Sequence, residues 1–139
     1  MKKEKKYAWW VITFIGTILF IAPACQKYPD GPQISFRSKT ERVTNTWKVD
    51  KYIENGNDFT SQTIGYTETY TKDGNYSYLD NNHSGTGIWN FQSGNKEIQL
   101  IGTSHLQTRV LYILRLEEKE FWYYYIDGSD HKEFHMIPN

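Results

Sequence analysis

Cys25 is the only cysteine of this 139-residue chain and the first candidate for chemistry. It directly follows Ala22, Pro23 and Ala24, where a strongly apolar run gives way to polar sequence. A lone thiol in an exported protein is paired between chains, left reactive or used for attachment. The position of Cys25 at the end of an apolar run favours attachment.

The histidines do not predict a metal site. His131 and His135 have the i, i+4 spacing that places two ligands together on a helix, but on a strand they stand about 13 Å apart at ~3.3 Å per residue. With Cys25 used for attachment no thiol nucleophile remains, and the chain has no glycine-rich phosphate loop and no Gly-x-Ser-x-Gly. We therefore expect no enzyme activity, no metal and no cofactor.

Charge argues against a nucleic-acid partner. Residues 25–139 carry 12 basic and 15 acidic side chains, a net charge of −3. Nucleic-acid binding leaves a basic footprint, which is missing here. The length of the chain suits a single domain.

Residues 1–24 have the order of a secretory signal. Basic MKKEKK precedes about sixteen largely apolar residues, YAWWVITFIGTILFIA, and small residues follow. The alternative is an uncleaved membrane anchor, although a spanning helix needs roughly 20 apolar residues.

Residues 22–25, Ala-Pro-Ala-Cys, resemble the lipobox of bacterial lipoproteins, and Ile21 fits as well. The resemblance implies cleavage before Cys25, linkage of its thiol to diacylglycerol and acylation of its amine, and two or more chains anchor stably. The absence of Asp after Cys25 implies the outer membrane, on its periplasmic face by default, with the cell surface as an alternative.

A tether and a short helix come next. Residues 25–35 include QKYPDGPQ, whose two prolines and one glycine suit an extended linker. Ser38 precedes Glu41 by three residues, a capping-box spacing that predicts one or two helical turns.

From Trp47 onward the hydrophobic period is two, which predicts strands. An aromatic content of 17% together with Thr, Ile and Val is strand composition. Turn signals such as KDGN, SGN and DGSD separate eight segments. These are residues 46–53, 63–71, 76–79, 86–91, 96–101, 108–116, 120–126 and 131–137.

Short turns between consecutive strands predict an all-β antiparallel up-and-down meander over residues 36–139. Closing eight strands into a barrel removes both sheet edges and leaves an interior that is filled or holds one small ligand. The alternative is a sandwich of two packed sheets.

The stretch YPDGPQISFRSKTERVTNTWKVDKY, with its Gly-Pro, short Ser-Lys helix and Trp at the start of strand one, resembles the small lipocalin-like lipoproteins of Gram-negative bacteria. The resemblance implies that Trp47 closes one end of the barrel. It also implies a basic residue packed on Trp47 from a late strand, for which Lys132 is suitably placed. Such relatives imply binding of small apolar molecules.

The faces predicted to point into the barrel carry mostly aromatic side chains, some with hydroxyls suited to an amphipathic ligand. This lining is either a ligand pocket or ordinary core. The candidate residues are Trp47, Lys51, Tyr66, Glu68, Tyr70, Trp89, Phe91, Tyr112, Tyr123 and Phe134.

Lys51 and Glu68 are the two charged members of this set. A buried charge needs a partner, so they either form an internal ion pair, hold the polar end of a ligand or lie solvated near a barrel mouth.

A structural or interaction module of the envelope is the alternative to ligand binding. Residues out of phase with the inward set would form an apolar outer patch for a partner protein, or be covered by the short helix. They are Leu111, Ile113, Trp122, Tyr124 and Ile126.

Overall fold

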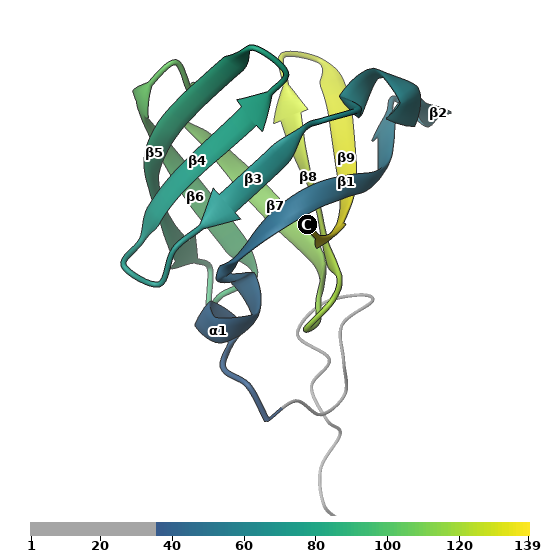
Figure 1. The fold of residues 1–139 in the computed structure, drawn as a ribbon. Coiled ribbons are helices and arrows are strands. Elements are labelled where there is room, and N and C mark those ends of the chain that lie inside the picture. The colour runs from purple at the N-terminus through teal and green to yellow at the C-terminus, as the bar shows by residue number, and fades with distance from the viewer. Residues whose placement is uncertain (1–35) are drawn as a thin grey trace, which may run out of the picture.

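The computed structural model describes residues 36–139, so the predicted signal peptide, Cys25 and the tether lie outside the described residues. Within 36–139 no helix is long and apolar enough to cross a bilayer. The elements are mostly strands (Figure 1). They are α1 (Lys39–Val43), β1 (Asn45–Glu54), β2 (Asn57–Asp58), the 3-10 helix η1 (Thr60–Thr63), β3 (Thr67–Tyr70), β4 (Asn75–Asp80), β5 (His83–Gln92), β6 (Glu97–Ser104), β7 (Arg109–Leu116), β8 (Phe121–Asp127) and β9 (Asp130–Pro138).

The strands form a closed antiparallel barrel. From β3 to β9 each strand pairs with the next in sequence, and β1 pairs with both β3 and β9. The closing ladder between β1 and β9 runs from Trp47 opposite Pro138 to Glu54 opposite Lys132. The eight-stranded meander barrel is therefore confirmed, and the two-sheet sandwich is wrong because both would-be edge strands pair with each other.

Two segments differ from the sequence-based prediction. β2 is an extra strand of two residues, paired only with the end of β1. The strand expected to begin at residue 63 begins at Thr67, because η1 occupies Thr60–Thr63 and Gly65 has a φ of +85°. A left-handed residue of this kind interrupts an extended strand and is readily adopted only by glycine.

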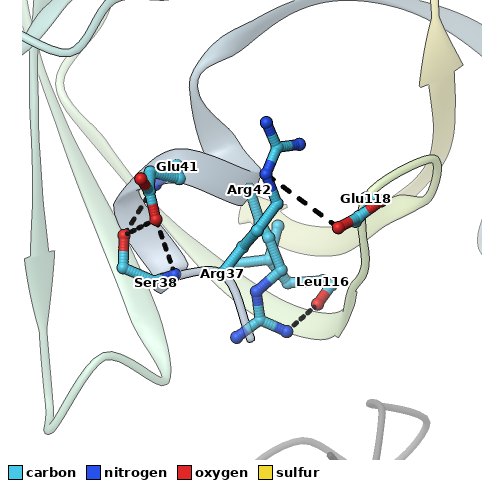
Figure 2. A network of polar contacts seen from close by, with 6 residues as sticks. All are labelled: Arg37, Ser38, Glu41, Arg42, Leu116 and Glu118. Atoms are coloured by element: carbon cyan, nitrogen blue, oxygen red, sulfur yellow. Dashed lines mark hydrogen bonds and ion pairs between the residues drawn. The ribbon is translucent and has the colours of Figure 1, made fainter. Parts of the chain in front are cut away.

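The predicted capping box starts α1. The Ser38 hydroxyl accepts a hydrogen bond from the Glu41 amide at 3.2 Å, and the Glu41 carboxylate accepts one from the Ser38 amide at 2.8 Å (Figure 2). These bonds satisfy two of the backbone groups that a helix start leaves without partners. A helix of five residues is too short to be stable alone, so α1 also depends on its packing.

α1 closes one end of the barrel. The Trp47 indole is fully buried and donates a hydrogen bond from Nε1 to the Val43 carbonyl at 2.8 Å. The Arg42 guanidinium donates from Nη1 to the Leu116 carbonyl at 2.7 Å, and Arg37 lies 3.9 Å from Glu118 (Figure 2). Because Arg42 and Val43 are both buried, the helix is part of the core.

We expect Ser38→Ala to lower the free energy of unfolding by about 1 kcal/mol, the usual cost of removing a capping side chain. Urea denaturation followed by tryptophan fluorescence measures the change. Ser129→Ala is the matched control, since Ser129 is an exposed turn residue. Equal stability of the two variants would show that the capping box does not support the closed end.

Candidate binding site

Eight of the ten candidate residues lie on the interior side of the barrel wall. Seven of these eight are aromatic residues whose rings are buried or pack against the core, and the eighth is Glu68, whose carboxyl group is buried. The eight are Trp47, Tyr66, Glu68, Tyr70, Trp89, Phe91, Tyr123 and Phe134.

The interior placement of Lys51 and Tyr112 is wrong. Lys51 is exposed because the β1–β9 register shifts between Val49 and Lys51, which reverses the inward phase and brings Tyr52 into the core. Tyr112 is 37% exposed and lies on the outer face. An extra residue in one strand moves every later side chain to the opposite face.

The predicted outer patch is also corrected. Leu111 and Ile113 are buried in the core, and the register shift in β7 comes only after Ile113. Trp122, Tyr124 and Ile126 do lie on the outer side, where Trp122 stacks on His135 at 4.1 Å and Tyr124 on His131 at 4.6 Å.

The carboxylate of Glu68 is the centre of the interior. Oε1 accepts hydrogen bonds from the hydroxyls of Tyr66 at 2.8 Å, Tyr76 at 2.9 Å and Tyr123 at 2.8 Å. Oε2 accepts one from Tyr70 at 2.8 Å. An ionised carboxylate offers about four acceptor sites, and here four phenols donate to it, three of them to the same oxygen. Glu68 is therefore partnered by neutral hydroxyls, and the predicted ion pair with Lys51 does not form.

The hydrogen bond from Tyr123 joins opposite walls of the barrel. Glu68 lies on β3 and Tyr123 on β8, and β1 and β9 separate these strands around the wall. The two side chains therefore meet across the interior. Ring contacts continue this packing, with Tyr70 edge-on to Tyr76 at 5.0 Å and to Phe121 at 5.6 Å. This layer is filled by protein side chains.

The same packing holds the phenols neutral. Burial, followed by the negative charge of Glu68, raises the pKa of Tyr70 and of Tyr123 well above the ordinary value of 10.0. The same two causes, in that order, raise the pKa of Tyr66 and of Tyr76. Each phenol thus keeps the proton that it donates to Glu68.

The end of the barrel opposite α1 has a different lining. Here β7 begins, β8 ends and the loops after β4, β6 and β8 gather. We call this end the barrel mouth and define it by six side chains. They are Tyr52, Tyr66, Tyr78, Leu106, Arg109 and Tyr125.

The loop between β6 and β7 packs into the mouth over glycines. A Cβ atom at Gly102 would lie 1.7 Å from the Leu106 carbonyl oxygen, and one at Gly85 would lie 2.7 Å from the His105 carbonyl oxygen. Such contacts are impossible, so only glycine permits this close backbone approach. Tyr78 also holds the loop by donating a hydrogen bond to the His105 carbonyl at 2.8 Å.

Arg109 is the cation of the mouth. It is half-buried, and its guanidinium carbon lies 4.5 Å from the centre of the Tyr125 ring. Burial alone would lower the pKa of Arg109, but attraction to Tyr125, Tyr66 and other phenols outweighs it and raises the pKa. Among residues 36–139, no carboxylate forms an ion pair with Arg109.

The remaining mouth charges are partnered. Lys132 lies 2.9 Å from the carboxylate of Asp127, and the Tyr52 hydroxyl donates to the carboxylate of Glu54. In the β1–β9 ladder Lys132 lies opposite Glu54, at the other end of β1 from Trp47. Lys132 therefore does not pack on the Trp47 indole, contrary to what the family resemblance implied.

Two open depressions mark the surface. One of about 280 Å³ lies beside the mouth and is lined by Tyr78, Asn82, His83, Ser84 and His105. The other, of about 390 Å³, lies on the outer face of β3 to β6, where threonine side chains such as Thr69 and Thr86 line it beside Ile88.

Sequence reasoning missed several interior and mouth residues, chiefly Tyr76, Tyr78, Arg109 and Tyr125. Tyr125 alternates in phase with Tyr123, which is predicted inward, so that signal is available in the sequence. Tyr76 and Tyr78 alternate with each other on a strand for which the sequence analysis names no inward residue. Arg109 was hidden because TRVLYILRL has apolar side chains on both faces, which leaves its inward phase ambiguous.

Glu68→Gln tests the carboxylate centre. An amide oxygen accepts fewer hydrogen bonds and its nitrogen only donates, so phenols lose their acceptor. We expect the free energy of unfolding to fall by about 3 kcal/mol, as when a buried charged network is broken. Urea denaturation measures this free energy of unfolding. Glu133→Gln is the control, because Glu133 lies on the outer wall and its substitution should cost less than about 1 kcal/mol. A similar effect in both variants would contradict the central role of Glu68.

The raised pKa values predict an alkaline limit to stability. The folded protein raises the pKa of these phenols. Their contribution to the free energy of unfolding is therefore fully present below the pKa of the unfolded state, about 10, and is lost as the pH rises above that value. Ultraviolet titration of tyrosinate should show at least these four phenols ionising only with unfolding, beside Tyr52 and Tyr125, whose pKa values are also raised. Their ionisation near pH 10 in a still-folded protein would contradict the hydrogen-bonded centre.

No family model matches the chain, and no curated protein matches it. The candidate site is therefore defined by its own geometry: a closed end capped by α1, a filled centre around Glu68, and a mouth lined by rings and the Arg109 cation.

Proposed function

We propose that this protein is a lipid-anchored, lipocalin-like lipoprotein that binds a small amphipathic molecule at the barrel mouth without catalysing a reaction. The observation that carries the proposal is the difference between the two ends of the barrel. α1, Trp47 and Arg42 close one end, whereas the other combines tyrosine rings, two of them half-buried, with an arginine that forms no ion pair with a carboxylate of residues 36–139.

The filled centre limits where a ligand can bind. Tyr70 and Tyr123 are each 1% exposed, and they meet Glu68 across the interior. A ligand that reached this layer would have to displace hydrogen bonds to a buried carboxylate, which is costly. The proposed ligand therefore stays above the Glu68 layer.

The depression beside Tyr78 gives the scale of the ligand. Its volume of about 280 Å³ is just below the roughly 300–1,000 Å³ of sites for drug-sized molecules. Tyr78 belongs both to this depression and to the mouth, where it stacks on Tyr66 at 6.1 Å. Rings that carry hydroxyls suit a molecule with one apolar and one polar part.

The proposed anchor is consistent with an accessible mouth. Ten residues separate Cys25 from Phe36, a reach of at most about 35 Å when fully extended. The described chain enters the barrel at α1, on the closed end. A bilayer attached through Cys25, on the periplasmic face of the outer membrane by our proposal, would lie nearest the closed end, with the mouth directed away.

A protein-interaction role is the second candidate, and one outer feature favours it. Ile88 and Ile101 pair across β5 and β6, and they are 47% and 36% exposed beside the larger depression. Adjacent exposed apolar side chains are a feature of partner sites.

Native mass spectrometry of the chain purified gently from its envelope tests the first candidate. We expect a reproducible extra mass that disappears on denaturation and that Tyr78→Ala reduces. Tyr112→Ala is the matched control, because Tyr112 lies on the outer face and should keep the extra mass. A bare mass for the unaltered protein would contradict small-molecule binding and favour the interaction role.

A further inference from the structure

Among residues 36–139, Arg109 is a mouth cation that no carboxylate holds in an ion pair. Asp127 is bonded to Lys132 at 2.9 Å, and Glu54 accepts the hydroxyl of Tyr52. Arg109 forms no ion pair with any of residues 36–139, although it is half-buried. A partly desolvated guanidinium gains more from an anion than an exposed one does, because the surrounding dielectric is lower.

Glu68 does not serve as the hydrogen-bonded partner of Arg109. The Glu68 carboxylate accepts four hydrogen bonds, all from phenols, three on Oε1 and one on Oε2. Of these phenols Tyr66 lines the mouth, and no hydrogen bond joins the Arg109 guanidinium to Glu68 among residues 36–139. The guanidinium is therefore left to interact at the mouth side.

The orientation of Arg109 suits recognition of an anion. Its guanidinium carbon lies over the Tyr125 ring at 4.5 Å, so one face of the planar group is covered. The N–H groups of a guanidinium point outward in its plane, and a forked pair of them fits a carboxylate or a phosphate. Tyr125 thus positions the side chain while its hydrogen-bonding edge remains for a ligand.

We infer that the barrel mouth binds the anionic head group of a single-chain amphiphile, a carboxylate or a phosphate monoester, through Arg109. This inference rests on the proposed function and adds the charge of the ligand. The apolar part would lie against the rings near Tyr78 and Leu106, above the filled Glu68 layer.

The test uses the full-length chain in zwitterionic lipid nanodiscs with three soluble probes: octanoate, octyl phosphate and octanol. The chain has four arginines, Arg37, Arg42, Arg109 and Arg115, so a ¹⁵N spectrum of their Nε–H groups contains few signals. We expect octanoate or octyl phosphate to shift the Arg109 signal saturably, and octanol to leave it in place. The tighter of the two anions identifies which head group the site prefers.

Arg109→Gln should weaken binding of the preferred anion about 10-fold or more, since a hydrogen bond to a charged group contributes ~1.5–3 kcal/mol. Binding of octanol, followed on tyrosine ring signals, should change less than about 2-fold, because it depends on apolar burial. Arg115→Gln is the matched control, as Arg115 lies on β7 over the Trp122 ring and bonds Glu120. Arg109→Lys, which keeps the charge but loses the fork, should retain part of the affinity.

The outcomes separate the two proposals. Equal binding of octanol and both anions, with no effect of Arg109→Gln, would overturn the anion site and leave small-molecule binding intact. No saturable binding of any probe would overturn both. If Arg109→Gln does not fold, the unaltered protein still tests the anion site, because a preference of that protein for octanol over both anions would contradict the inference.

Discussion

The buried carboxylate of Glu68 is the constraint on which the rest of the interior depends. A charge at 3% exposure is costly unless hydrogen bonds replace its hydration. Four phenols supply these hydrogen bonds. Tyr76 lies on β4, Tyr123 on β8, Tyr70 at the end of β3 and Tyr66 just before β3 begins. Each must reach the same point, which restricts the positions of these strands relative to one another.

This requirement explains why the barrel has a filled centre and two unlike ends. Bonds across the interior, above all the one from Tyr123, leave the middle layer occupied by side chains. Below it, apolar packing of Trp47 and Phe121 continues into α1. Above it, the wall ends in tyrosines, Arg109 and a loop that packs over glycines. A binding function is therefore supported at one end of this barrel.

Prediction from sequence succeeded where local rules apply. The capping box at Ser38 and Glu41, the number of strands in the meander and the inward phase of Tyr66, Glu68 and Tyr70 are as expected. It failed in β1 and β7, where it placed Lys51 and Tyr112 inside the barrel. A shift of register in β1 leaves no mark in hydrophobic alternation, and the β7 segment is apolar on both faces.

By itself the sequence determined the elements: a capped helical turn and eight strands joined by short turns, because periodicity and turn chemistry act over a few neighbouring residues. Only the tertiary structure decided which side chains meet. That four phenols converge on Glu68, and that Arg109 stands over Tyr125 without an ion pair to any carboxylate of residues 36–139, follows from barrel closure and strand register. These are relations between residues far apart in the chain, which local patterns do not encode.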